Sequence, residues 1–167
     1  MKVQDVMTKS AIACAPDTNL ESAALLMWDN DCGTLPVVAD GGHVIGMITD
    51  RDICMATALN RRAPGKMAVG EVVTGKVFAC SPEDDVREAL KTMQHEGIRR
   101  LPVVKPDGTL SGIVSMNDVV LKAQEAVDGK APELSYADVV STFKGICTHH
   151  QLTPIPEQEM LQKTAAT

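Results

Sequence analysis

Hydrophobic and polar positions follow one order twice along the chain. Leu35 and Leu101 mark the constant offset between the copies, 101 minus 35 or 66 positions. Each copy opens with a short apolar run, followed by a segment whose apolar residues recur with the period of an α-helix. Two more apolar runs and a second helical segment complete it. In the first copy these segments cover 11–14, 20–30, 35–38, 44–48 and 52–59.

The two middle runs of each copy predict a β-hairpin. Asp40-Gly41-Gly42 separates them in the first copy and Lys105-Pro106-Asp107-Gly108 in the second, and both are turn compositions. The last helical segment of the second copy covers 118–127. Each repeat is therefore predicted to be β-α-β-β-α, which places the chain in the mixed α/β (α+β) class.

The start of the first helix has its own signal. Pro16 precedes Asp17 and Thr18, and we expect one of these two side chains to be the N-cap. Trp28 adjoins the apolar stripe of that helix. It is expected either at a dimer interface or half-buried in the core.

The repeats define the predicted domain organisation. Two copies are too few for a solenoid, so we expect two similar units packed face to face, with ligand-sized grooves between them. The first repeat is assigned to 3–60, a linker to 61–68, the second repeat to 69–127 and a C-terminal extension to 128–167. Within that extension Tyr136, Val139, Val140 and Phe143 form an apolar stripe, which predicts a short helix over Ser135–Lys144.

The amino-acid composition and net charge limit the classes of function that this protein can have. Hydrophobic residues make up 44% of the chain and charged residues 23%, as in ordinary globular proteins. The formal net charge of −6 argues against nonspecific binding to nucleic acid or to an anionic membrane surface. The chain contains no apolar run long enough to span a membrane and no signal-peptide pattern at Met1, so the expected location is cytoplasmic.

The sequence gives little support for a metal site or for a catalytic nucleophile. The five cysteines include no C-x-x-C pair and are expected to be free thiols. Cys147, His149 and His150 lie close together, but no further ligand completes a metal site by spacing. A Gly-x-Ser-x-Gly elbow and a P-loop are both absent, so we do not expect an enzyme.

The pattern that carries chemistry is Gly46–Asp52, matched by Gly112–Asp118. In both copies a strand with a glycine ends in a hydroxyl residue, and an aspartate follows three positions later at a helix start. A hydroxyl and the free N–H groups of a helix start can bind phosphate, and the carboxylate can accept both hydroxyls of a ribose. The same spacing is also that of an ordinary helix cap, and the motif alone leaves both interpretations open.

The complete pattern resembles the cystathionine-β-synthase (CBS) domain, in the tandem arrangement called a Bateman module. The resemblance covers Val3 to about Gln124 and rests on four motifs, each with a counterpart 66 positions later. They are Asp5-Val6-Met7-Thr8, Pro16-Asp17-Thr18-Asn19-Leu20, Leu35-Pro36-Val37-Val38 and Gly46–Asp52. Members of this family bind adenosyl ligands in the clefts between the repeats and act as regulatory modules.

The resemblance implies a set of ligand-binding residues. Asp52 and Asp118 would hold ribose hydroxyls, and Thr49 and Ser115 would face ribose or phosphate. Adenine would be framed by Ile12, Ala13, Phe78, Ala79, Pro36 and Pro102. The complete expected set is Ile12, Ala13, Thr34, Pro36, Thr49, Arg51, Asp52, Phe78, Ala79, Arg99, Arg100, Pro102, Ser115, Asn117 and Asp118.

Two departures from the family pattern make the two clefts unequal. Asp50 places a second carboxylate beside Thr49, which is unfavourable near phosphate unless it turns outward. Before the Leu-Pro-Val-Val strand the first copy has Gly33-Thr34, whereas the second has Arg99 and Arg100. A guanidinium pairs two phosphate oxygens at once, so these arginines are the best phosphate ligands, although a solvated basic turn is the alternative. Arg51 is a weaker candidate.

The resulting hypothesis is a regulatory module that binds an adenosyl ligand, with AMP first and ADP, ATP, NAD or S-adenosylmethionine as alternatives. By the same resemblance we expect a homodimer formed through helices and a target protein that the sequence does not identify. The alternative function is a protein-interaction module with degenerate, empty clefts.

Overall fold

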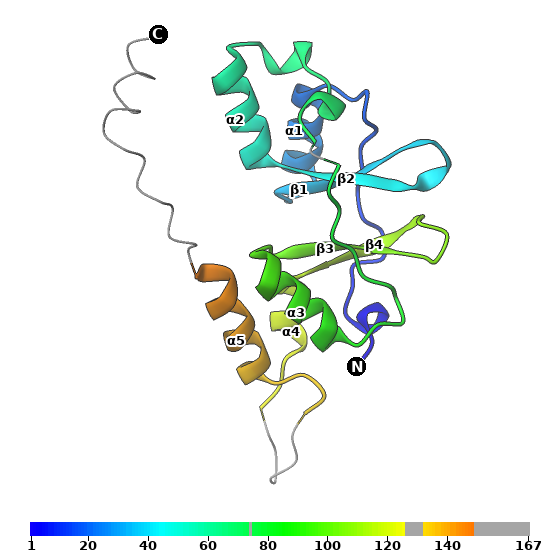
Figure 1. The fold of residues 1–167 in the computed structure, drawn as a ribbon, viewed down its shortest axis with the longest axis vertical. Helices are drawn as coiled ribbons and strands as arrows, with labels where there is room; N and C mark the ends of the chain where they lie inside the picture. Colours follow the sequence, from blue (N-terminus) through cyan, green and yellow to red (C-terminus); the bar gives the residue numbers. More distant parts are fainter. Residues whose placement is uncertain (74, 126–131, 149–167) are drawn as a thin grey trace, which may run out of the picture.

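The computed structural model describes residues 1–73, 75–125 and 132–148, and within them the chain forms two similar halves (Figure 1). Each half has a two-stranded antiparallel sheet and two helices. The first contains α1 (Leu20–Asp29), β1 (Thr34–Val38), β2 (Val44–Thr49) and α2 (Asp50–Asn60). The second contains α3 (Val86–Glu96), β3 (Arg100–Val104), β4 (Leu110–Ser115) and α4 (Met116–Lys122), followed by α5 (Tyr136–Cys147). The mixed α/β prediction is confirmed.

The two hairpins lie in the middle of the molecule, with the helices of each half on the side away from the other half (Figure 1). Their registers match at the offset of the repeat, because Thr34 pairs with Thr49 and Arg100 with Ser115. An isolated bridge between His43 and Thr109 joins the hairpin tips. The turn between β1 and β2 and the turn between β3 and β4 therefore meet at the seam between the halves.

The strand predicted at the start of each repeat is reduced to a single bridge. Cys14 bridges Val37, with the Cys14 N–H donating to Pro36 O at 3.0 Å and the Val38 N–H to Cys14 O at 2.9 Å. The next bond of that ladder would need an N–H on Pro36, which proline lacks. Pro102 stops the bridge between Cys80 and Val103 in the same way.

The helix caps differ from the prediction. Asn19, not Asp17 or Thr18, is the N-cap of α1, and its side chain accepts from the Ser22 N–H at 2.8 Å. The Thr18 hydroxyl is instead engaged by the Ala15 N–H in the preceding turn, at 3.1 Å. Because the hydroxyl residues that end β2 and β4 are themselves N-caps, α2 and α4 begin two residues earlier than predicted. α4 ends at Lys122, and the predicted end of that helix at Val127 lies outside the described residues.

The segments at the start of the two repeats cross over between the halves. Val3 and Val6 are buried in the core of the second half, where the Val3 N–H donates to Asp84 O at 2.9 Å. Met67 and Val69 are buried in the core of the first half, with the Leu20 N–H donating to Met67 O at 2.9 Å. Each core therefore includes a segment at the start of the other repeat, which ties the halves together.

α5 extends the second half. Ser135 caps it, and its Val139 and Thr142 are buried, whereas Tyr136 and Val140 of the predicted stripe are about half exposed. Residues 128–131 and 149–167 of the predicted extension lie outside the described part of the chain. Among the helices that the structure describes, none is both long enough and apolar enough to cross a membrane.

Candidate ligand-binding cleft

The carboxylate of Asp118 is held by both parts of the chain. Ser115 ends β4 and caps α4, and its backbone N–H and hydroxyl donate to Asp118 Oδ2 at 2.8 and 2.5 Å. The Thr8 hydroxyl, from the N-terminal segment, donates to Asp118 Oδ1 at 3.1 Å. Each carboxylate oxygen has two acceptor sites, so these three bonds orient the group and leave one acceptor site, on Oδ1, for a ligand.

A cleft of about 400 Å³ opens beside this carboxylate, within the size range of small-molecule sites. Four segments form it: the N-terminal segment, the turn after α1, the start of β3 and the junction of β4 with α4. The lining residues are Thr8, Ser10, Ala11, Ile12, Asn30, Asp31, Cys32, Thr34, Arg100, Ile113, Ser115, Asn117 and Asp118. The cleft is thus built from both halves of the molecule.

Arg100 supplies the positive charge of the cleft. It is partly buried and lies opposite Ser115 in the hairpin register, while Asp31 and Asp118 supply negative charge to the same cleft. Arg99 is exposed and is not among the lining residues; its backbone carbonyl accepts the Met116 N–H at 3.0 Å. One guanidinium beside a carboxylate fits a ligand that carries a small anionic group next to hydroxyl groups.

The structure brings six of the expected ligand-binding residues together in this cleft. They are Ile12, Thr34, Arg100, Ser115, Asn117 and Asp118. The Thr34 hydroxyl offers little to a ligand, because it is buried and already donates to Ile48 O at 2.9 Å. The expected residues that do not line this cleft are Ala13, Pro36, Thr49, Arg51, Asp52, Phe78, Ala79, Arg99 and Pro102.

The equivalent place in the first half is much smaller. Thr49 and Asp52 form the same capping box, with the Thr49 N–H and hydroxyl donating to Asp52 Oδ2 at 2.9 and 2.7 Å. The hollow that reaches Asp52 has only about 70 Å³ and is lined by Met47, Ile48, Val72 and Val73. Val73 lies so close that a Cβ placed on Gly46 would overlap its Cγ1. Here capping is the role that the observed contacts show.

Two other expected residues, Phe78 and Arg51, make contacts within the protein. The Lys76 ammonium lies 4.4 Å from the centre of the Phe78 ring, a cation–π contact. Asp50 turns away from the cleft at Asp118 and lines a groove between α1 and α2, where its Oδ1 accepts the Arg51 N–H at 2.7 Å. The Asp50 carboxylate, which follows Thr49 at the junction of β2 with α2, is thus directed outward.

Most of the polar residues that line the cleft together with Asp118 were not predicted from the sequence. Thr8 belongs to a motif that both repeats share, so the duplication was a usable signal for it. Asn30, Asp31 and Cys32 follow α1 without any motif, and Asp31 adopts a left-handed conformation with φ of 48°. That backbone turn, which only the folded chain reveals, brings the segment to the cleft.

The described residues contain no group of three or more His, Cys, Asp or Glu side chains placed to hold a metal ion. Cys147 is exposed at the end of α5, and His149 and His150 lie outside the described ranges. The sequence expectation of no metal site stays a prediction for the complete chain.

Comparison with known proteins agrees with the geometry. The CBS domain family model matches residues 3–58 and 69–125. The CBS domain-containing protein YhcV of Bacillus subtilis is 31% identical over 139 residues, which cover 82% of this chain and 97% of that protein. Hypoxic response protein 1 of Mycobacterium tuberculosis is 28% identical over 145 residues, 87% of this chain and 93% of that protein.

Solved structures share the fold. The CBS domain pair of protein MJ0100, in complex with methylthioadenosine and S-adenosylmethionine, is 26% identical with a TM-score of 0.66, over 72% of this chain and 94% of that one. Hypoxic response protein I with two coordinated zinc ions is 27% identical with a TM-score of 0.69, over 74% and 100%. Because both repeats are matched in sequence and in fold, the chain belongs to the CBS domain family as a tandem domain pair.

Proposed function

We propose that this CBS domain pair binds one adenosyl compound in the cleft at Asp118 and regulates a partner through that binding. The observation that carries the proposal is the oriented carboxylate of Asp118, which Thr8 and Ser115 hold at the edge of a cleft of about 400 Å³. The free acceptor site of this preoriented carboxylate suits one ribose hydroxyl, and the neighbouring hydroxyl would take the place of the Thr8 or Ser115 hydroxyl.

The remaining cleft residues support the other parts of such a ligand. Ile12 and Ile113 provide apolar surface for the base, and the partly buried Arg100 provides a cation for one phosphate. AMP carries one phosphate and is therefore the first candidate. S-adenosylmethionine and methylthioadenosine are bound by the related pair in MJ0100, so adenosyl compounds without phosphate belong in the same test.

Regulation would follow from a shift in population between arrangements of the two halves. The cleft takes Arg100 and Asp118 from the second repeat and Ile12 and Asp31 from the first, so a bound ligand bridges them. A ligand that prefers one arrangement by 1.4 kcal/mol changes the ratio about tenfold. Asp31 also lines the groove between α1 and α2, which gives the cleft a short connection to an outer surface.

Thermal unfolding with and without ligand tests the proposal. A ligand at 100 times its dissociation constant stabilises the folded chain by about 2.7 kcal/mol. We expect AMP, ATP, NAD, S-adenosylmethionine or methylthioadenosine to raise the melting temperature, with guanosine monophosphate as the control. If none of them changes the melting temperature at millimolar concentration, the proposal is wrong.

A protein-interaction module with empty clefts is the second candidate, favoured by the 84% exposure of Trp28. Such a module would show no stabilisation by any adenosyl compound. A third reading, an enzyme acting on a nucleotide, predicts product formation from ATP, which chromatography of an incubated sample would detect.

A further inference from the structure

The turn after α1 has the same hydrogen bonding as the turn after α3. The Cys32 N–H donates to Met27 O at 2.9 Å in the first turn. At the repeat offset, the Ile98 N–H donates to Met93 O at 3.0 Å. A helix end closed by such a bond contains one residue in the left-handed conformation, usually a glycine. The two turns are therefore a matched pair, and their residues can be compared position by position.

Asp31 occupies the left-handed position of the first turn. Its φ is 48°, whereas the second turn has Gly97 at the same place, with φ of 66°. Glycine adopts this conformation without steric cost, and a residue with a Cβ does not. Asp31 also lies directly beyond the C-terminal end of α1, where the helix dipole disfavours a negative charge. The turn by itself thus favours glycine on two counts, and the local fold gives no reason for a carboxylate.

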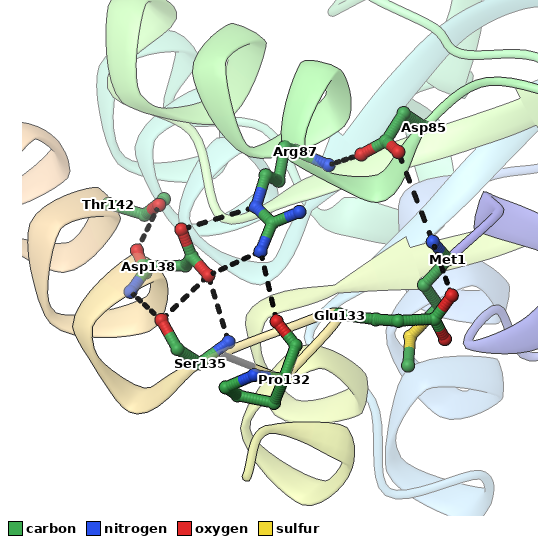
Figure 2. Close-up of polar contacts among 8 residues, drawn as sticks. All are labelled: Met1, Asp85, Arg87, Pro132, Glu133, Ser135, Asp138 and Thr142. Carbon is green, nitrogen blue, oxygen red and sulfur yellow. Dashed lines mark hydrogen bonds and ion pairs between the residues drawn. The ribbon is translucent and has the colours of Figure 1, made fainter. Parts of the chain in front are cut away.

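Other aspartates of the chain have contacts that stabilise the fold, and Figure 2 shows two of them. Asp138 accepts the Ser135 N–H at 2.8 Å and pairs with Arg87 at 3.3 Å, which joins α5 to α3. Asp85 caps α3 by accepting the Arg87 N–H at 2.8 Å. With the residues that the structure describes, the Asp31 carboxylate forms neither a hydrogen bond nor an ion pair. It belongs instead to the lining of the cleft at Asp118.

The two turns bring charges of opposite sign to this cleft. Asp31 lines it from the first repeat, and the partly buried Arg100 lines it from the second. Asp50 adds negative charge behind the first turn, because its Oδ2 lies 3.0 Å from where a Cβ on Gly33 would be. Among the described residues that line the cleft, Asp31 and Asp118 are negative and Arg100 alone is positive. The cleft therefore has one cation for one phosphate and none for a second.

We infer that Asp31 selects the ligand by charge, so that the cleft admits adenosyl compounds with at most one phosphate and excludes nucleoside diphosphates and triphosphates. The inference rests on the proposed binding of an adenosyl compound in this cleft. Arg100 can neutralise one phosphate, whereas each further phosphate enters a cleft whose remaining charges are negative. The same carboxylate attracts a positive group, such as the sulfonium of S-adenosylmethionine.

Titration calorimetry with adenosyl compounds of different charge tests this selection, in buffer without divalent cations. The compounds are S-adenosylmethionine, methylthioadenosine, AMP, ADP and ATP. The wild-type chain should bind AMP about tenfold or more tightly than ATP. Asp31→Asn keeps the size of the side chain and its tolerance of the left-handed conformation, but it removes the charge. It should raise the ratio of ATP to AMP affinity about fivefold, lower the affinity for S-adenosylmethionine about threefold and leave methylthioadenosine unchanged.

Asp29→Asn is the matched control. Asp29 is the last residue of α1, two positions before Asp31, and its substitution changes the net charge by the same amount. Because Asp29 does not line the cleft, the ratio of ATP to AMP affinity should stay at the wild-type value. A wild-type chain that binds ATP as tightly as AMP would overturn the inference, and so would an equal change of the ratio in both variants.

Failure of the proposed function gives a different result. If none of the five compounds binds to the wild-type chain or to Asp31→Asn, the cleft is not an adenosyl site and both proposals are wrong. If AMP or methylthioadenosine binds but the affinity ratio does not respond to Asp31→Asn, the charge selection alone is wrong.

Asp31→Gly provides a measurement that needs no ligand, because it installs the residue of the second turn. Urea unfolding should show unchanged or increased stability, since glycine removes the steric cost of the left-handed conformation. A clear loss of stability would show that the Asp31 carboxylate holds the turn together, and it would overturn the inference.

Discussion

The Thr8 hydroxyl donates a hydrogen bond to the Asp118 carboxylate at 3.1 Å, although the two residues are 110 positions apart in the chain. The N-terminal segment reaches Asp118 because Thr8 pairs with Ile113 of β4 through two backbone hydrogen bonds of 2.9 and 3.0 Å. The side chain proposed to bind ribose is therefore oriented by the segment that begins the first repeat. Because of this contact, residues of the first and of the second repeat form the cleft together.

Asp118→Ala and Asp52→Ala should separate ligand binding from helix capping. Both carboxylates complete capping boxes, so each substitution should cost about 1 kcal/mol of folding free energy. Only Asp118 lines the large cleft, and losing a charged hydrogen bond of about 1.5–3 kcal/mol should weaken AMP binding by about 10- to 100-fold. Titration calorimetry gives the affinity and urea unfolding gives the stability. Equal loss of affinity in the two variants would contradict the asymmetry of the clefts.

Arg100→Gln should weaken the binding of AMP by about tenfold or more, because a charge-assisted contact to phosphate is lost. Adenosine has no phosphate and should bind Arg100→Gln and the wild-type chain equally well. Arg99→Gln is the matched control, since Arg99 precedes Arg100 but does not line the cleft. If Arg99→Gln loses as much AMP affinity as Arg100→Gln, the assignment of the phosphate contact to Arg100 is wrong.

The sequence predicted the repeat, the hairpins and the order of the helices, because hydrophobic periodicity and turn residues are local signals. It missed the loss of the first strand at Cys14, which depends on the missing N–H of a proline in another segment, Pro36. The sequence also indicated Asp17 or Thr18 as the cap of α1. It could not show that the Thr18 hydroxyl accepts the Ala15 N–H in the preceding turn, because that contact forms only in the folded chain. Hydrophobic periodicity predicts which segments form helices and strands. The residues at which these elements begin and end depend on which hydrogen bonds form in the folded chain.

The sequence predicted those residues of the candidate site that belong to a motif present in both repeats. Ser115 and Asp118 belong to a duplicated motif, and they line the cleft together. The difference between Asp52 and Asp118 was visible only in part, through the arginines of the second copy. That Val73 packs against Gly46 follows from how the start of the second repeat folds onto the first half, which no local pattern reports.

Acid should weaken the attachment of α5. Burial by itself would raise the pKa of Asp138, but hydrogen bonds from Ser135 and the pairing with Arg87 outweigh burial and lower the pKa from its usual 3.8. With the folded-state pKa below the unfolded one, this stabilisation is present above about pH 4 and is lost as the pH falls through the folded-state value. Urea unfolding between about pH 6 and pH 2 should show the wild-type advantage over Asp138→Asn disappearing in acid. An advantage that persists unchanged at the lowest pH would contradict this role.

The cysteines should differ widely in reactivity. Burial raises the pKa of Cys14 to about 11, and burial together with Asp84 raises the pKa of Cys80 to about 12, so both thiols should resist alkylation until the chain unfolds. Cys54 and Cys147 are exposed and should react first. Mass spectrometry of peptides after timed alkylation at about pH 8 measures each rate. Rapid labelling of Cys14 or Cys80 in the folded chain would show that the cores open.

Cys32 should report on the ligand. It is partly buried and lines the cleft, so an adenosyl compound bound there should slow its alkylation and leave Cys54 unaffected. The ratio of the two rates, with and without AMP, removes any general effect of AMP on the reagent. An unchanged rate at Cys32 under saturating AMP would place the ligand elsewhere.

A crystal structure of the complete chain grown with AMP tests the central claim most directly. We expect density for one AMP per chain, with both ribose hydroxyls within hydrogen-bonding distance of the Asp118 carboxylate and the phosphate beside Arg100. Density for AMP at Asp52 or on the outer surface, with the cleft between Thr8 and Asp118 empty, would contradict the claim.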